Sequence, residues 1–247
     1  MTRTGYRPRP EKTAMILARR IVEDIRRRDL NTGDRLPPEH AMLEAYQVGR
    51  GTLREALRFL ELQKVISLKP GPGGGPTVEK PDASTLATAM LLLLQFDNAE
   101  FSTVVETRCD LEPLMARLAA ERMTAEQLDA LAASVDLMRE GLKDRATFLR
   151  TNIDFHDLVA WGTQNAIYGF LVDALIDILD GSAVGVDYPQ PRREAVLRAH
   201  VAILEALQRH DGDASHEAMR RHVDEYAKYV AKKFPEALTQ RVRWDLA

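Results

Sequence analysis

The residues best suited to bind a metal ion are three histidines in the second half of the chain. Asn152 and His156 are four residues apart, a spacing that places both side chains on one face of a helix. His200 and His222 each lie about eleven residues from a turn at 211–213, so an antiparallel helix pair would bring both imidazoles to nearly the same height. Three imidazole nitrogens and one amide oxygen can hold a divalent ion such as zinc, nickel or manganese.

Spacing alone leaves a second interpretation open, because a histidine on an apolar helix face is more often a hydrogen-bonded core residue than a ligand. A similar choice concerns Arg108, which lies in an apolar stretch and is expected to face inward, where a guanidinium needs an anionic partner. Glu112, one helical turn further on, is one candidate for that partner. An external carboxylate or phosphate is the other.

A second group of functional candidates is a set of arginines near the N-terminus. Arg50 and Arg54 lie one turn apart on a segment whose apolar positions predict a helix, and a shorter helix is expected at about 38–46. Two short helices joined by a tight turn, with exposed arginines on the second, are typical of a helix-turn-helix. Both guanidinium groups would reach the major groove, where guanine offers the O6 and N7 acceptors. Thr52 adds a hydroxyl, and Arg35 precedes the first helix at a position suited to a phosphate or a base edge.

Two extended pieces at 65–69 and 76–79 follow, separated by a glycine-rich stretch at 71–75. Glycines leave the backbone accessible, so we expect Gly73 and Gly74 to bring amides close to a DNA phosphate. The pattern predicts a two-stranded wing.

The charge distribution divides the chain in the same way. Residues 1–80 contain 16 Lys and Arg against 10 Asp and Glu, whereas residues 81–247 contain 18 against 27. A basic end on an acidic body is consistent with one end that binds a polyanion. No signal peptide or apolar run long enough to span a membrane is visible, and a single cysteine fits a reducing compartment, so a cytoplasmic location is expected.

The remaining periodicity is helical, and it predicts a mainly α protein. We expect a winged helix-turn-helix domain at 1–80 and an all-α antiparallel bundle at 81–247. The helices of the bundle are predicted at about 82–96, 100–122, 124–142, 145–161, 165–180, 190–210 and 213–232, with a short one near the C-terminus.

The segments GDRLPPE at 33–39 and VGRGTLREALRFLE at 48–61, followed by the glycine-rich wing, resemble the signature of the GntR family of transcription regulators. One departure is Gly49, where the family usually has serine. The segments VETR at 105–108 and NIDFH at 152–156, with His200 and His222, resemble the FCD effector domain of the FadR subfamily. Together the resemblance covers about 11–229.

The resemblance implies a homodimeric regulator, a repressor, that binds double-stranded operator DNA and responds to a small organic acid. It also implies that Arg108 holds the carboxylate of this effector, beside a divalent metal bound by Asn152, His156, His200 and His222. Many relatives have aspartate at the position of Asn152, and Asp154 is displaced onto another helical face. A neutral amide should hold an ion more weakly than a carboxylate does.

Two other classes of function remain open at this point. A metal-dependent enzyme fused to a DNA-binding head would use the histidines to activate water, but it needs a nearby general base. Asp154, His210 and His216 are the available groups, and all are expected to lie off the face where the histidines converge. An architectural DNA-binding protein would leave the inward Arg108 and the histidines without a role.

Overall fold

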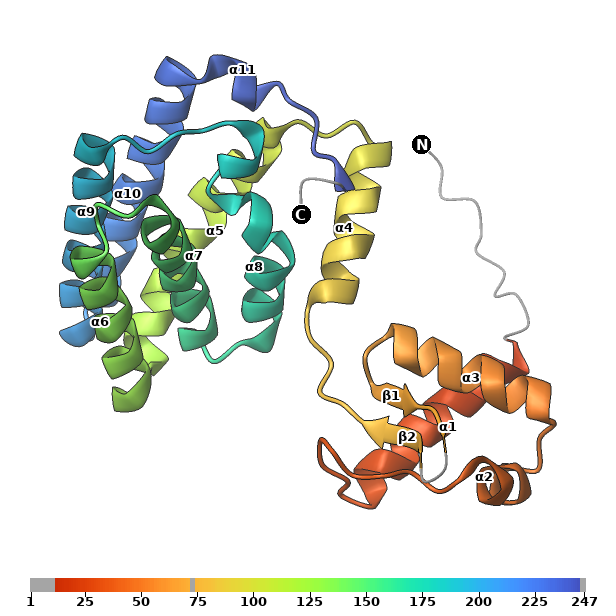
Figure 1. Cartoon of the computed structure of the whole chain (residues 1–247). Coiled ribbons are helices and arrows are strands. Elements are labelled where there is room, and N and C mark those ends of the chain that lie inside the picture. The colour runs from red at the N-terminus through yellow and green to blue at the C-terminus, as the bar shows by residue number, and fades with distance from the viewer. Residues whose placement is uncertain (1–11, 72–73, 245–247) are drawn as a thin grey trace, which may run out of the picture. The chain divides into compact units, whose positions relative to one another are not determined.

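The computed structural model describes residues 12–71 and 74–244, and these divide into two compact units between Thr85 and Leu86. The first contains three helices and a two-stranded hairpin, and the second is built from helices (Figure 1). In the described part of the chain, no helix is long and apolar enough to cross a membrane.

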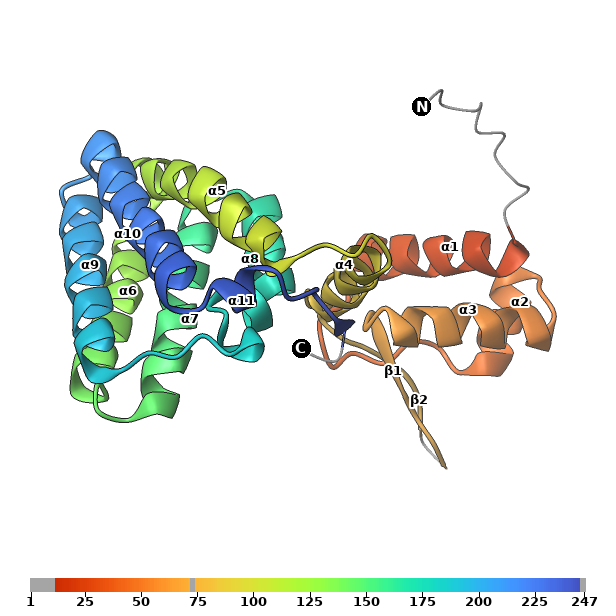
Figure 2. The same ribbon diagram turned by 90° about the horizontal axis from the view of Figure 1, so that it is seen from above.

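The first unit contains the predicted winged helix-turn-helix. Helices α1 (Thr13–Arg27), α2 (Glu39–Tyr46) and α3 (Arg50–Leu62) precede the strands β1 (Ile66–Lys69) and β2 (Gly75–Val78). The strands pair antiparallel, with Ile66 opposite Val78, and the hairpin extends away from the helices (Figure 2).

The core of this unit follows from the apolar stripes of α1 and α3. Leu17 and Ile21 of α1 pack with Leu53 and Leu57 of α3, and all four are almost completely buried. On α1, Leu17 is buried whereas Met15 is only half-buried. Packing against α3 selects the face, since a helix buries one stripe against its neighbour.

The second unit is an antiparallel bundle whose helices lie close to the predicted ranges. Its helices are α4 (Ser84–Phe96, which begins at the unit boundary), α5 (Phe101–Arg122), α6 (Ala125–Glu140), α7 (Arg145–Gly162), α8 (Ala166–Leu179), α9 (Gln190–Gln208), α10 (Gly212–Lys233) and α11 (Pro235–Leu238). A short 3₁₀ turn, η1 (Ser182–Val184), was not predicted. Helix α10 packs against α5 and α9, and α7 packs against α5, α6 and α8.

Local sequence sets several of these helix starts. Asp144, Asn165 and Asp211 each accept a hydrogen bond from a backbone N–H in the first turn of the helix that follows, and Thr124 forms a capping box with Gln127. Such caps satisfy amide groups that have no partner inside the helix. The cap at Asp211 fixes the turn between α9 and α10, which in turn sets the relative height of His200 and His222.

Candidate functional site

The recognition helix candidate α3 presents its arginines to solvent. Arg50 and Arg54 are exposed, and Thr52 is partly exposed, while Leu53 and Leu57 on another face of the same helix are buried. The side chain of Arg54 is 71% exposed and its Nε lies 3.7 Å from Glu39 Oε2 on α2. An ion pair this exposed contributes little to stability, so the Arg54 guanidinium can exchange it for another anion.

The wing and the segment before α2 lie next to each other in this unit. Arg35 is exposed and forms a β-bridge with Thr77 of β2, which ties it to the hairpin. The N–H of Gly74 donates to the carbonyl of Gly71 at 2.9 Å, and a Cβ on Gly74 would collide with the carbonyl oxygen of Lys69. The tight turn therefore explains the glycine at 74, and it uses the amide that we expected to face a phosphate. Gly73 lies outside the described residues.

The three histidines converge in the core of the bundle. His222 Nε2 of α10 lies 3.3 Å from His200 Nε2 of α9 and 3.3 Å from His156 Nε2 of α7. All three residues are buried, and their ligand atoms lie within 4.8 Å of one another. Zinc–nitrogen bonds of about 2.0–2.1 Å in a tetrahedron separate two ligand nitrogens by about 3.3–3.4 Å. The two short separations match this spacing.

The protonation of the histidines also suits a cation. Glu112 Oε2 lies 2.7 Å from His156 Nδ1, a position that favours a proton on Nδ1 and leaves a lone pair on Nε2. His222 Nε2 carries either one N–H or one lone pair, so it can form a well-directed hydrogen bond with only one of its two imidazole neighbours. A cation between the three nitrogens would instead accept a lone pair from each of them.

Burial keeps two of these histidines neutral. Removal from water, and then the charges of neighbouring groups, hold the pKa of His200 and of His222 well below the ordinary value of 6.5. Phe155 stacks on the ring of His200 with centroids 3.8 Å apart, which fixes the orientation of the imidazole. Neutral imidazoles with fixed rings are the form that a metal requires.

Asn152 is buried on α7 one turn before His156, as the spacing predicted. Asp154 is exposed and lines a separate groove between α6 and α7. His210 Nδ1 contacts the carbonyl of Ala120 at 2.8 Å, away from the other histidines. A carboxylate is therefore missing from the position next to the three imidazoles in the described part of the chain, except for Glu112 behind His156.

Arg108 connects the histidines to a cavity. Its Nε donates to Glu112 Oε1 at 2.5 Å, its Nη1 donates to the carbonyl of Leu179 at 2.6 Å, and its Nη2 lies 3.2 Å from His156 Nε2. Its guanidinium also lies over the ring of Tyr226. The side chain is buried, as expected, and it contacts Glu112, one of the two partners that the sequence left open.

The Arg108–Glu112 pair is a true ion pair despite its burial. Burial by itself would raise the pKa of the Glu112 carboxyl, but the charge of Arg108 and the contacts with Arg108 and the His156 ring outweigh it, and the pKa lies below its ordinary value. Burial would likewise lower the pKa of Arg108, but Glu112 raises it above the ordinary value. Both groups therefore carry their charges.

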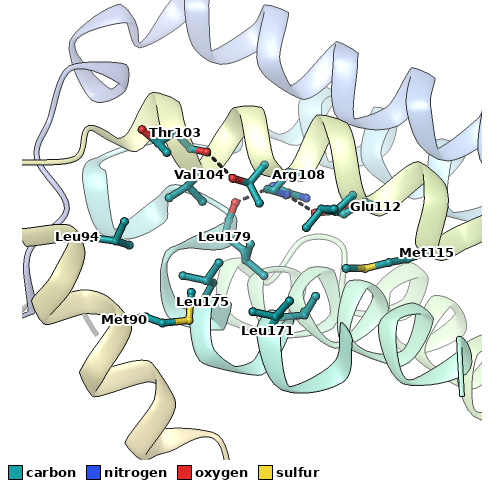
Figure 3. Close-up of a pocket in the computed structure, with 13 residues that line it drawn as sticks. Met90, Leu94, Thr103, Val104, Arg108, Glu112, Met115, Leu171, Leu175 and Leu179 are labelled. Atoms are coloured by element: carbon teal, nitrogen blue, oxygen red, sulfur yellow. Dashed lines mark hydrogen bonds and ion pairs between the residues drawn. The ribbon is translucent and has the colours of Figure 1, made fainter. Parts of the chain in front are cut away.

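The cavity beside Arg108 has a volume of about 150 Å³ and lies between α4, α5 and α8. Figure 3 shows Arg108 and Glu112 on α5, with apolar side chains from α4 and α8 approaching the same space. The cavity and the three histidines share Arg108 and Glu112, because both residues line the cavity and both contact His156. A ligand in the cavity would thus lie next to Arg108 and Glu112, which also contact His156.

Two regions of the chain match known families. Residues 103–225 match the FCD domain, and residues 14–74 match the bacterial regulatory proteins of the gntR family. The chain belongs to the GntR family and carries an FCD domain.

Among curated relatives of this GntR-family chain is the HTH-type transcriptional repressor NanR of Escherichia coli (strain K12). The two are 28% identical over 228 residues, which cover 89% of this chain and 86% of the relative. NanR of Enterobacter sp. (strain 638) is 28% identical over 219 residues. A solved structure of Streptococcus agalactiae GntR has the same fold, with a TM-score of 0.70, 24% identity, and coverage of 87% of this chain and 99% of that chain.

These findings identify a DNA-binding transcription regulator with a ligand-binding C-terminal domain, not an enzyme. Sequence reasoning missed the contact of Glu112 with His156, and the positions of the Leu179 carbonyl and Tyr226 around Arg108. Each of these contacts joins helices that are far apart in the sequence, so no local pattern could have indicated them.

Proposed function

We propose that this GntR-family regulator is a repressor that binds a two-fold operator as a homodimer and releases it when an organic acid binds in the FCD domain. Arg35, Arg50, Thr52 and Arg54 would contact the DNA, with the wing beside them. The exposure of Arg50 and Arg54 on one helix over a buried apolar face supports this assignment. Large exposed apolar side chains on α4, such as Leu93 and Phe96, support a second copy that covers them.

The effector domain would hold a divalent metal through His156, His200, His222 and the side-chain oxygen of Asn152. The observation that carries this proposal is the buried set of three Nε2 atoms, two pairs of which are 3.3 Å apart. Such an ion supplies a positive charge that attracts the effector carboxylate. The imidazoles, the amide and the carboxylate of Glu112 would fix its position.

Arg108 would be the second group that binds the carboxylate. A guanidinium has five N–H groups, and three of those on Arg108 already have partners among the described residues. The lone pair of His156 Nε2 can accept a hydrogen bond from Arg108 or bind an ion, but not both. Metal binding would therefore release one more N–H group of Arg108 beside the ion. Arg108 would then meet the carboxylate with its terminal nitrogens while Glu112 retains Nε.

The DNA assignment is tested with a duplex selected from a random-sequence library by the full chain. Replacement of Arg54 by Ala is expected to weaken binding to this duplex about 5- to 150-fold, equivalent to about 1–3 kcal/mol. Stability should not change, because the side chain is 71% exposed. Arg139→Ala, an exposed arginine on α6, is the matched control. Equal affinity of Arg54→Ala and the control in a gel-shift titration would remove Arg54 from the interface.

The selected duplex also tests the assembly. A homodimer that reads DNA through two recognition helices selects a sequence with two-fold symmetry. An asymmetric single site, together with a monomer mass in sedimentation, contradicts the homodimer.

A further inference from the structure

The cavity beside Arg108 is lined mainly by apolar side chains, in contrast to the charged Arg108 and Glu112 on its α5 side. Thirteen residues line it, and nine of them are apolar: Met90, Leu94, Val104, Leu111, Met115, Leu171, Val172, Leu175 and Leu179. They come from three helices, and Figure 3 shows Met90 of α4 and Leu175 of α8 directed toward the face of α5 that carries Arg108. We name this space the apolar chamber.

Three of the four polar side chains on the wall of the apolar chamber are bound to other parts of the protein, and the fourth, that of Thr103, is exposed to solvent. Thr107 Oγ1 donates to the carbonyl of Thr103 at 2.8 Å. Glu112 contacts Arg108 with one carboxylate oxygen and His156 with the other. Among these side chains only Arg108 keeps unassigned N–H groups, and it lies on the α5 side of the chamber. A ligand hydroxyl along the rest of the wall would lose its hydrogen bonds to water without replacement.

The size of the chamber limits the apolar part of the ligand. Its volume is about 150 Å³. A protein cavity of about this volume, lined by aliphatic and aromatic side chains, accepts a molecule the size of benzene. The ligand part that fits is therefore a group of about six carbons rather than a long chain.

We propose that the effector is a monocarboxylic acid with a compact apolar group of about six carbons, seated in the apolar chamber with its carboxylate at Arg108. This inference rests on the proposed function, which places the carboxylate there. It adds the chemical class of the remainder of the molecule, and it excludes polyhydroxylated acids of the same length. Discrimination comes from the lost hydrogen bonds of each buried hydroxyl and from the burial of each methylene.

The test is a calorimetric titration of the zinc-loaded full chain with acetate, butyrate, hexanoate, decanoate and gluconate. Hexanoate and gluconate have six carbons each but differ in their hydroxyl groups. Affinity is expected to rise about fourfold for each methylene from acetate to hexanoate. Decanoate should gain nothing beyond hexanoate because the chamber is full, and gluconate should bind no more tightly than acetate.

A variant that enlarges the chamber tests its location. Leu175→Ala is expected to shift the preferred acid from hexanoate toward decanoate, because it removes part of the wall. Leu137→Ala, an exposed leucine on α6 outside the chamber, should leave the preference unchanged. The readout is a ratio of affinities within one variant, so partial destabilisation does not affect it.

The outcomes separate this inference from the proposed function. Equal affinity for hexanoate and gluconate, no binding of any acid, or an unchanged preference in Leu175→Ala overturns the apolar chamber. Operator release by gluconate alone would overturn it as well, while the regulator function would stand. Tight, length-dependent binding that never changes operator affinity would uphold the chamber and refute effector control of DNA binding.

Discussion

Glu112 is the residue whose replacement tests the arrangement of the effector site most directly. Its two carboxylate oxygens contact Arg108 Nε at 2.5 Å and His156 Nδ1 at 2.7 Å, and the residue is 4% exposed. Glutamine has the same shape, so Glu112→Gln removes the charge without opening a cavity. The change affects Arg108 and His156 at once. The effect on Arg108 is measured as stability, and the effect on His156 as metal affinity.

Stability should fall because Arg108 would remain charged and buried without its counterion. Breaking a buried ion pair by removing one partner costs about 3–5 kcal/mol. The amide oxygen of glutamine still accepts from Nε, so we expect the lower end, about 3 kcal/mol. Metal affinity should fall about 10- to 100-fold, because His156 loses the carboxylate that sets its tautomer and orientation.

Urea unfolding followed by tryptophan fluorescence measures the first effect. Trp161 and Trp244 are the only tryptophans of the chain, and both belong to the helical unit. Glu106→Gln is the matched control, because Glu106 lies on the same helix and is exposed. It should change the free energy of unfolding by less than about 0.5 kcal/mol.

Zinc titration of the folded variant measures the change in metal affinity. If Glu112→Gln does not fold, Glu112→Asp takes its place in this measurement. Aspartate keeps the charge for Arg108 but is too short to hold both partners, so metal affinity should fall while most of the stability remains. If Glu112→Gln matches Glu106→Gln in both measurements, the role assigned here to Glu112 is refuted.

Further predictions concern the metal and the cysteine. At free zinc about 100 times the dissociation constant, the free energy of unfolding should be about 2.7 kcal/mol higher than after chelator treatment. His222→Ala should abolish this stabilisation by zinc. An equal stabilisation of His222→Ala would exclude the histidine site. Asn152→Asp should tighten zinc binding on the order of tenfold, since it adds a charged ligand, and weaker binding would show that Asn152 is not a ligand. Burial raises the pKa of the Cys109 thiol, so less thiolate is present at a given pH; its alkylation by iodoacetamide at pH 8 should be slower than that of free cysteine, and an equal rate contradicts the burial.

The local features of this protein were readable from its sequence. Helix ranges followed from apolar periodicity and caps, and the exposed positions of Arg50 and Arg54 followed from the apolar stripe on another face of the same helix. The symmetric distances of His200 and His222 from one tight turn predicted their meeting, and their Nε2 atoms are 3.3 Å apart. In each case the information lies within one helix or across one short turn.

Tertiary structure alone decided the surroundings of these residues. Glu112 meets His156, and Arg108 meets the carbonyl of Leu179, across helix pairs whose relative register no local pattern specifies. A shift of one helical turn, about 5.4 Å, would break either contact and leave the periodicity unchanged. The apolar chamber has the same origin, since its wall combines side chains from α4, α5 and α8 that only packing brings together.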